Sequence, residues 1–277
     1  MALFVELLKK NFNLYEGTLL KNIFFVLLVS LVIFNSPSNC QIDKQVETDI
    51  VHFFRTGGDL VNNFTSFEKP TPINFAVSLA LIGGSYALDN NVKKFAEVNH
   101  SNLSDKIFSV DKIYGNEYTL IGIAGIYGYG LIFKNEDVHK IGLQTIEAVG
   151  YAGIITSVLK VVVGRSRPYT NEAHSMFRPF NFHAATTSFP SGHATVAFAM
   201  STVLANNTNS LFLKILSYTA AGLVDCSRIY HNAHWFSDVV AGSAIGYFVG
   251  DFVSQEHSEK NTSIMYIPGG ISLSIKF

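Results

Sequence analysis

Apolar and polar residues recur with the spacing of α-helices along most of the chain after residue 41. Residues 46–63 form an amphipathic stretch, whereas residues 73–88 and 118–133 are largely apolar and contain closely spaced glycines. Apolar side chains at every third or fourth position are typical of helices, and small residues allow two helices to approach closely. The pattern therefore predicts three helices that pack tightly against their neighbours.

Four further helices are predicted in the region that ends near residue 254. The first covers residues 142–165 and stops before Pro168, because a proline disfavours the helical conformation in the residue that precedes it. The other three are expected to start near Pro190, at residue 211 and near His234, and to end near residues 206, 228 and 253. The remaining tail is polar and becomes strand-like at residues 271–277.

Short turns favour an antiparallel, up-and-down arrangement of these four helices. The end of the first helix then lies beside the start of the second, the end of the third and the start of the fourth. The unusual polar residues of this region all lie near those four positions. We therefore predict an all-α fold, a helical bundle with the active site at one end.

A short apolar run near the N-terminus predicts export. Residues 23–34 are apolar, Lys21 precedes them, and small or polar residues lead to Cys40. A dozen apolar residues match the core of a signal peptide and fall short of the roughly 20 residues that span a bilayer. An uncleaved membrane anchor is the alternative, and both interpretations predict a cell-envelope protein with an extracytoplasmic active site. The predicted segments are 1–40 for the leader or anchor, 41–141 for the N-terminal helices, 142–254 for the catalytic core and 255–277 for the tail.

Composition narrows the possible functions. The net charge of −1 at pH 7 offers no broad basic surface, so no nucleic-acid partner is expected. The mean hydropathy of +0.25 exceeds that of an ordinary soluble enzyme, and contact with a membrane surface is expected. Several apolar segments are nearer 16 residues than the roughly 20 that span a bilayer, which leaves membrane crossing open. Cys40 and Cys226 lack the spacing of a zinc site, and no metal cofactor is expected.

Three polar clusters carry the candidate chemistry. They are Lys160 with Arg167 and Pro168, the run from Pro190 to His193, and Ser227 with Arg228, His234 and Asp238. The three cations Lys160, Arg167 and Arg228 require an anion, and planar guanidinium groups match phosphate oxygens well. Ser191 and Gly192 open a helix, where free backbone N–H groups and the helix dipole favour phosphate. The clusters therefore predict a phosphate site.

Two histidines can divide the work of phosphoryl transfer. His234 and Asp238 are four residues apart, the spacing at which side chains meet on a helix, so the carboxylate can orient an imidazole nucleophile. His193 is positioned to protonate the leaving oxygen as a general acid. Each cluster alone fits an ordinary helix start or surface pair, whereas all three in this order favour a catalytic site.

The clusters resemble the motifs of the PAP2 superfamily, which includes type 2 phosphatidic acid phosphatases and vanadium haloperoxidases. The family pattern is Lys, six residues and Arg-Pro, then Pro-Ser-Gly-His, then Ser-Arg, five residues, His, three residues and Asp. The resemblance covers residues 142–254. It implies catalytic roles for His234, His193 and Asp238, and phosphate binding by Lys160, Arg167, Ser191, Gly192 and Arg228.

The resemblance implies a metal-independent phosphatase that forms a phosphohistidine. The expected substrates are phosphate monoesters or diphosphates, above all those of lipids such as phosphatidic acid, phosphatidylglycerophosphate, undecaprenyl diphosphate or lipid A. Vanadate is then an inhibitor. A vanadate-dependent haloperoxidase, with vanadate as its cofactor, and a non-catalytic phospholipid-binding protein are the alternatives. The histidine pair with Asp238 favours catalysis, because binding alone needs neither a nucleophile nor an acid. In the long loop of residues 169–189, His174, Arg178 and His183 are candidates for substrate contact, whereas His231 lies off the motif positions.

Overall fold

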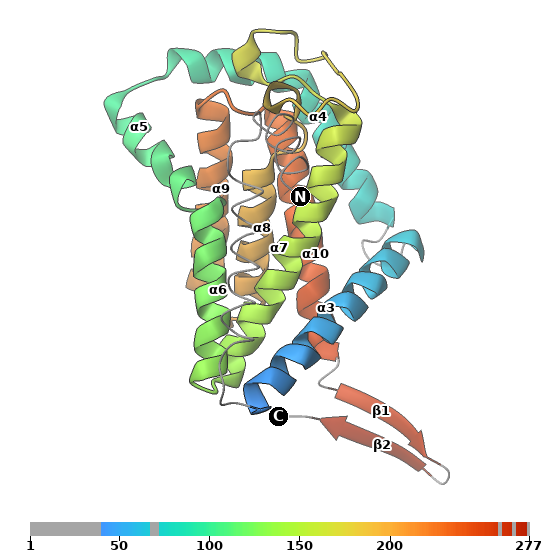
Figure 1. Ribbon diagram of the computed structural model, residues 1–277. Helices are drawn as coiled ribbons and strands as arrows, with labels where there is room; N and C mark the ends of the chain where they lie inside the picture. Colours follow the sequence, from blue (N-terminus) through green and yellow to red (C-terminus); the bar gives the residue numbers. More distant parts are fainter. Residues whose placement is uncertain (1–39, 67–71, 260–261, 268–269, 276–277) are drawn as a thin grey trace, which may run out of the picture.

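The computed structural model describes residues 40–66, 72–259, 262–267 and 270–275, and within them the chain is mainly helical (Figure 1). The predicted leader lies outside the described residues except for its last residue, Cys40. The long helices are α3 (Cys40–Ser66), α4 (Pro72–Val98), α6 (Glu117–Ile132), α7 (Glu136–Val163), α8 (Gly192–Asn206), α9 (Leu211–Tyr230) and α10 (Phe236–Glu259). The short ones are α5 (Asn102–Ile107), η1 (Phe108–Lys112), η2 (Pro168–Thr170) and η3 (Ala184–Thr186).

The all-α prediction is confirmed, with one addition at the C-terminus. Strands β1 (Thr262–Ile267) and β2 (Gly270–Ile275) form an antiparallel hairpin, in which Thr262 pairs with Ile275. The hairpin follows α10 directly and extends away from the bundle in Figure 1. The strand-like character predicted for the tail therefore belongs to the second half of a hairpin.

Helix α7 ends earlier than predicted, and for a different reason. Gly164 follows its last residue with φ 60° and ψ 40°, a left-handed conformation that terminates helices, and its N–H donates to Lys160 O at 3.0 Å. A Cβ on Gly164 would also lie 1.9 Å from the Arg178 carbonyl oxygen, so glycine is required here. Arg165 and Arg167 consequently lie in a loop beyond the helix, and Pro168 does not set the helix end.

Several helices are longer than the sequence pattern suggested. α4 has 27 residues compared with 16 in the predicted segment 73–88, α7 has 28 compared with 24 in 142–165, and α10 has 24 compared with about 20. Among the described residues, α7 and residues 236–258 of α10 are long and apolar enough to cross a membrane by length and composition. In each, part of the apolar window is buried inside the protein, which is also typical of the core helix of a soluble protein.

The helices α7, α8, α9 and α10 form the bundle, and α8 lies among the other three (Figure 1). Its side chains Ala199 and Val203 pack with Ala148 and Ala152 of α7 and with Val253 of α10, and all five are buried. The predicted up-and-down order brings the end of α7, the start of α8, the end of α9 and the start of α10 to one end of the bundle. Burial of such apolar surface is the main stabilising contribution to the fold.

The contact between α8 and α10 is unusually close because α10 presents a stripe of glycines. These are Gly242, Gly246 and Gly250, spaced four residues apart along one face. A Cβ on Gly246 would lie 2.4 Å from the Thr195 carbonyl oxygen of α8, so even a methyl group cannot be accommodated there. Small residues at this spacing allow helix backbones to approach. The stripe fixes the distance between the two helices that carry His193 and Asp238.

Substitution of Gly246 by alanine is expected to destabilise the protein, because the methyl group would force α10 away from α8. Overpacking of this kind typically costs about 1–3 kcal/mol. Gly222 on α9 is the matched control, since its added Cβ would meet no atom within 4 Å. Gly222→Ala should leave stability unchanged or raise it by up to about 1 kcal/mol, the usual gain from glycine to alanine in a helix. Thermal unfolding of both variants tests the contact, and equal melting temperatures would contradict it.

Candidate active site

The predicted site residues come together at the end of the bundle where four helix ends meet. Lys160 lies in the last turn of α7, His193 in the first turn of α8, Arg228 in the last turn of α9 and Asp238 in the first turn of α10. The backbone N–H of Ser191 donates to the Asp238 carbonyl oxygen at 2.9 Å, which joins the start of α8 to the start of α10. Residues that are far apart in the sequence thus lie close together at this end of the bundle.

His234 is buried, with 3% of its surface exposed, and precedes α10 instead of lying within it. Its Nδ1 lies 2.8 Å from the Ser188 carbonyl oxygen and 3.7 Å from Asp238 Oδ2. The Asp238 carboxylate therefore lies beside the ring within ion-pair distance, while the hydrogen bond of Nδ1 is made with the loop. A ring that donates from Nδ1 to a carbonyl presents the lone pair of Nε2, the arrangement that a nucleophile requires.

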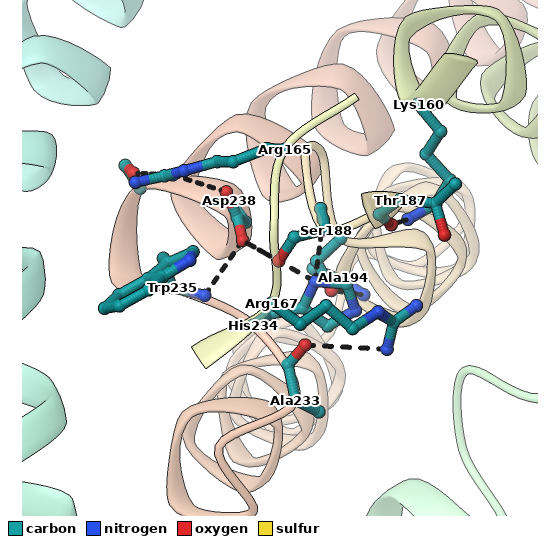
Figure 2. Close-up of polar contacts among 12 residues, drawn as sticks. Lys160, Arg165, Arg167, Thr187, Ser188, Ala194, Ala233, His234, Trp235 and Asp238 are labelled. Carbon is teal, nitrogen blue, oxygen red and sulfur yellow. Dashed lines mark hydrogen bonds and ion pairs between the residues drawn. The ribbon is translucent and has the colours of Figure 1, made fainter. Parts of the chain in front are cut away.

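The electrostatic environment keeps the His234 ring neutral. Burial lowers its pKa well below the usual value, and the positive charges of Arg167, Lys160 and Arg228 lower it further. Those charges act on one imidazole, so the three predicted cations do converge on the predicted nucleophile. Figure 2 shows Arg167 extended past His234, with Lys160 approaching from the end of α7. An anion is the species that such a cluster would bind.

Asp238 is fully buried and its carboxylate accepts hydrogen bonds from three directions (Figure 2). Arg165 Nη1 donates to Oδ1 at 2.6 Å, while Ser188 Oγ and the Trp235 N–H donate to Oδ2 at 2.5 and 2.9 Å. The Trp235 contact caps the start of α10. Asp238 therefore orients His234 largely through Ser188, whose hydroxyl binds Asp238 while its carbonyl binds the ring.

Arg165 is a residue whose role the sequence did not reveal. Only 1% of its surface is exposed, and its guanidinium spans two buried carboxylates, with Nη2 donating to Asp89 Oδ2 at 2.6 Å. Nη1 also donates to Ser237 Oγ at 2.7 Å, and Nε donates to the His174 carbonyl at 2.9 Å. Arg165 stands inside the first motif but off its required positions, and Asp89 lies at the polar end of an apolar segment. The only available signal was a carboxylate directly after an apolar segment, without an indication of its partner.

The three cations are held in different ways. Lys160 Nζ donates to the Thr187 carbonyl at 2.8 Å, and Arg167 lies in the loop beyond α7, so the two do not share one helix face as predicted. Arg228 Nη1 donates to Asp111 Oδ2 of η1 at 2.5 Å. Its buried Nε has no hydrogen-bond partner among the described residues. Asp111 was not predicted, and a donor left over on Arg228 is suited to a phosphate oxygen.

At the start of α8, the hydroxyl and the backbone N–H of Ser191 already have hydrogen-bond partners within the protein. Ser191 is buried and its Oγ accepts from the Ala194 N–H at 3.4 Å as the N-cap of α8, while its own N–H is used by Asp238. The N–H of Ser191 is thus unavailable to an anion. A Cβ on Gly192 would lie 3.7 Å from Lys160 Cε, so this glycine borders the lysine side chain.

His193 has a pKa lowered to about 3, first by burial and then by the positive charge of Arg228. Lys160 and Arg167 act in the same direction, whereas the carboxylate of Asp111 opposes them. At pH 7 the ring is therefore neutral. A phosphate dianion beside it would counter the surrounding cations and raise this pKa, because an opposite charge favours the protonated form.

The loop between α7 and α8 contains an internal ion pair and exposes aromatic side chains. Arg178 forms a two-pronged ion pair with Glu172 at 2.6 and 2.8 Å, and Glu172 has its pKa lowered to about 2 by Arg178. His174 contributes its carbonyl to Arg165. Outside the loop, His231 Nε2 contacts the Phe108 carbonyl at 3.1 Å from an exposed position. The exposed aromatic residues of the loop are Tyr169, Phe177, Phe180 and Phe182.

Sequence comparison shows that the chain is similar to several proteins named as phosphatases. The chain is 25% identical to the lipid A 1-phosphatase of Porphyromonas gingivalis over 222 residues, which cover 78% of this chain and 45% of that protein. It is 29% identical to the undecaprenyl-diphosphatase of Sulfolobus acidocaldarius, over 63% of this chain and 82% of that one. The lipid A 1-phosphatase of Rhizobium etli is 36% identical over 39% of this chain and 47% of its own length. The chain thus spans less than half of the first of these relatives.

Two solved structures also match, each with a TM-score of 0.49. One is that of Aquifex aeolicus LpxE, 25% identical, with 61% of this chain and 95% of that chain covered. The other is the first transmembrane PAP2 type phosphatidylglycerolphosphate phosphatase from Bacillus subtilis, 20% identical, with 77% and 95% covered.

A model of the PAP2 superfamily matches residues 142–261, the part of the chain that carries all three motifs. This match confirms the resemblance inferred from the spacing of the motif residues. The segment of residues 142–261 belongs to the PAP2 superfamily.

Proposed function

We propose that this protein is a phosphatase that hydrolyses phosphate monoesters or diphosphates of lipids through a phosphohistidine at His234. The observation that carries the proposal is a buried, neutral imidazole, anchored at Nδ1, on which the charges of Lys160, Arg167 and Arg228 converge. The names of the relatives, which are phosphatases of the same superfamily, support the reaction class.

The first chemical step forms a bond between His234 Nε2 and phosphorus while the bond from phosphorus to the leaving oxygen breaks. The cations stabilise the negative charge on the equatorial oxygens, which is the main contribution of a protein to phosphoryl transfer. The Ser188 carbonyl, backed by Asp238, stabilises the positive charge that develops on the ring. His193, protonated once the phosphate dianion has raised its pKa, gives its proton to the leaving oxygen.

The second step reverses these roles with water as the nucleophile. Neutral His193 accepts a proton from the water as the water oxygen bonds to phosphorus, and the bond to His234 Nε2 breaks. Inorganic phosphate is released and the His234 ring returns to its neutral form. Neither step requires a metal ion, because Lys160, Arg167 and Arg228 supply the positive charge that stabilises the transition state.

A lipid substrate is supported by exposed apolar side chains, both in the loop beside the site and elsewhere on the bundle. Phe180 and Phe182 of the loop are 69% and 63% exposed, and α4 and α6 also expose large apolar side chains such as Ile73 and Ile132. Exposed apolar surface of this extent is typical of a membrane contact. The relatives named for lipid A and undecaprenyl diphosphate support a phosphorylated lipid, and membrane location is supported by the two apolar helices.

We expect the active face to be extracytoplasmic, because the leader-like run of residues 23–34 should direct the following chain across the membrane. Phe182 is exposed in the loop beside the site, and a cysteine introduced there can be labelled with an impermeant maleimide in intact cells. The control is Cys226→Ala in the same background, because Cys226 is itself exposed. Labelling only after lysis would place the site on the cytoplasmic side.

Substitution of His234 by alanine is expected to abolish turnover and phosphate labelling of the enzyme, since it removes the imidazole that forms the phosphoramidate. His193→Ala should lower turnover by about two to four orders of magnitude for a poor leaving group, and by less for p-nitrophenyl phosphate. The measurement is a rapid quench at alkaline pH, where phosphohistidine is stable, followed by mass mapping of the labelled peptide.

His231→Ala is the matched control, because His231 is an exposed histidine of the same segment whose ring contacts the Phe108 carbonyl and the Tyr230 ring, outside the predicted catalytic set. It should keep near-native turnover and labelling. A label on Ser191 or on any residue other than His234 would reject the phosphohistidine mechanism and leave the phosphate site intact.

Orthovanadate should inhibit competitively at concentrations far below those of phosphate, because a trigonal-bipyramidal analogue binds more tightly than the ground state. Initial rates should be unchanged immediately after addition of excess chelator. Assays of halide oxidation on the vanadate-loaded protein should detect no activity. Loss of the initial rate on chelation with recovery on adding Mg²⁺, or halide oxidation at an enzymatic rate, would contradict the proposal.

A further inference from the structure

A cluster of two histidines and a glutamate joins three helices at a distance from the active site. It consists of His52 of α3, Glu147 of α7 and His257 of α10, and is called the His–Glu–His cluster below. His52 Nδ1 lies 2.7 Å from Glu147 Oε1, and His257 Nε2 lies 2.7 Å from Oε2. The carboxylate is fully buried, while 17% and 9% of the two histidine side chains are exposed.

The cluster is not part of the phosphate site. Glu147 precedes Lys160 by 13 residues in α7, which corresponds to about 20 Å along the helix axis. His257 lies in the last turn of α10, whereas Asp238 lies in its first turn. The cluster therefore belongs to the end of the bundle opposite the active site, where α3 crosses α7 and α10 in Figure 1. The proposed reaction uses none of its three residues.

The donor atoms match those of a transition-metal site. His52, Glu147 and His257 each offer one ligand atom, and these atoms all lie within 4.8 Å of one another. Two imidazole nitrogens and one carboxylate oxygen are a common donor set for Zn²⁺, with bonds of about 2.0–2.2 Å and ligand atoms about 3.3 Å apart in a tetrahedron. To reach that geometry the two contacts of 2.7 Å would lengthen by about half an ångström, and ligand atoms that are now up to 4.8 Å apart would move closer together.

The negative charge of the Glu147 carboxylate also favours binding of a cation between the three side chains of the cluster. The hydrogen bonds that the structure describes for the Glu147 carboxylate are both to imidazole nitrogens. With neutral imidazoles the cluster carries one buried negative charge, which is costly unless a positive charge accompanies it. Thr56 is fully buried, and its Oγ1 lies 3.3 Å from His52 Nδ1. That oxygen, or a water admitted through the partly exposed histidines, can complete a fourth position.

We infer that the His–Glu–His cluster binds Zn²⁺ as a structural site that fastens α3 to the bundle. α3 lies outside the segment matched by the PAP2 family model, so the site would anchor an added element to the family core. This inference does not rest on the proposed phosphatase function. It also differs from metal-assisted catalysis, since a zinc ion here is remote from His234.

The test is made on the full chain purified in detergent, with an affinity tag that contains no histidine. After exposure to excess Zn²⁺ and desalting, elemental analysis should find one zinc ion per chain. Added Zn²⁺ should raise the melting temperature, and prolonged chelation should lower it while the initial turnover rate stays unchanged. Substituted Co²⁺ should show the visible absorption of a tetrahedral site with nitrogen and oxygen ligands.

Glu147→Gln retains the size of the side chain but removes the anionic ligand, and should lower the zinc content by about an order of magnitude or more. His257→Gln is the second variant and should behave in the same way if Glu147→Gln folds poorly. His139→Ala is the matched control, because this histidine of α7 is also partly buried and pairs with Asp49, outside the cluster. It should bind zinc like the unaltered protein.

Two results would overturn the inference. One is a zinc content well below one ion per chain in the unaltered protein under zinc excess. The other is an equal zinc content and an equal zinc-dependent rise in melting temperature in the unaltered protein, in Glu147→Gln and in His257→Gln. Either result would identify the cluster as a hydrogen-bonded pairing of a buried carboxylate with two imidazoles.

Discussion

The buried guanidinium of Arg165 is the interaction on which the active site depends. It bridges Asp89 of α4 and Asp238 of α10, each at 2.6 Å, and thereby joins a helix of the N-terminal half to the motif-bearing core. Removal of one partner from a buried ion pair typically costs about 3–5 kcal/mol, because an uncompensated charge remains. The rings of Tyr86 and Trp235 lie over the guanidinium at 5.0 and 5.4 Å and restrict its position further.

The position of the nucleophile follows from this ion pair through a chain of short contacts. Arg165 holds Asp238 in place and opposes the rise in its pKa that burial causes, Asp238 accepts from Ser188 Oγ, and the Ser188 carbonyl binds His234 Nδ1. Each link uses a group that is buried and has a defined partner, so the ring cannot rotate without breaking a hydrogen bond inside the protein. The reactive nitrogen is directed by the fold before any substrate binds, which reduces the reorganisation needed for attack.

Much of the site was predictable because the motif residues are local in sequence and chemically unusual. The spacing of Lys160, Arg167, Arg228, His193 and His234 indicated a phosphate site, and the short turns predicted that they would meet at one end of a bundle. The helix limits were less accurate. Gly164 ends α7 by its left-handed backbone, and the fourth helix begins two residues after His234. The predicted i to i+4 contact is therefore made from outside the helix at 3.7 Å, and a hydrogen-bonded link through Ser188 supports it.

The partners that lie far away in sequence were not predictable. Asp89 and Asp111 are single carboxylates in segments without a motif, and nothing in their spacing relates them to Arg165 or Arg228. The same is true of Glu147, whose two histidines are 95 residues before it and 110 residues after it. Pairing at such separations is set by how the helices pack, and helix periodicity alone contains no information about it.

These distant carboxylates explain why the matched segment needs the rest of the chain. At the active-site end, residues 142–261 bring together the cations Lys160, Arg165, Arg167 and Arg228 and the single carboxylate Asp238. Four positive charges with one negative charge repel one another strongly in a buried environment. Asp89 and Asp111 of the N-terminal half supply two further negative charges, one beside Arg165 and one beside Arg228. The four cations then face three carboxylates, so a net positive charge remains for a phosphate ligand while the N-terminal half reduces the repulsion among the cations.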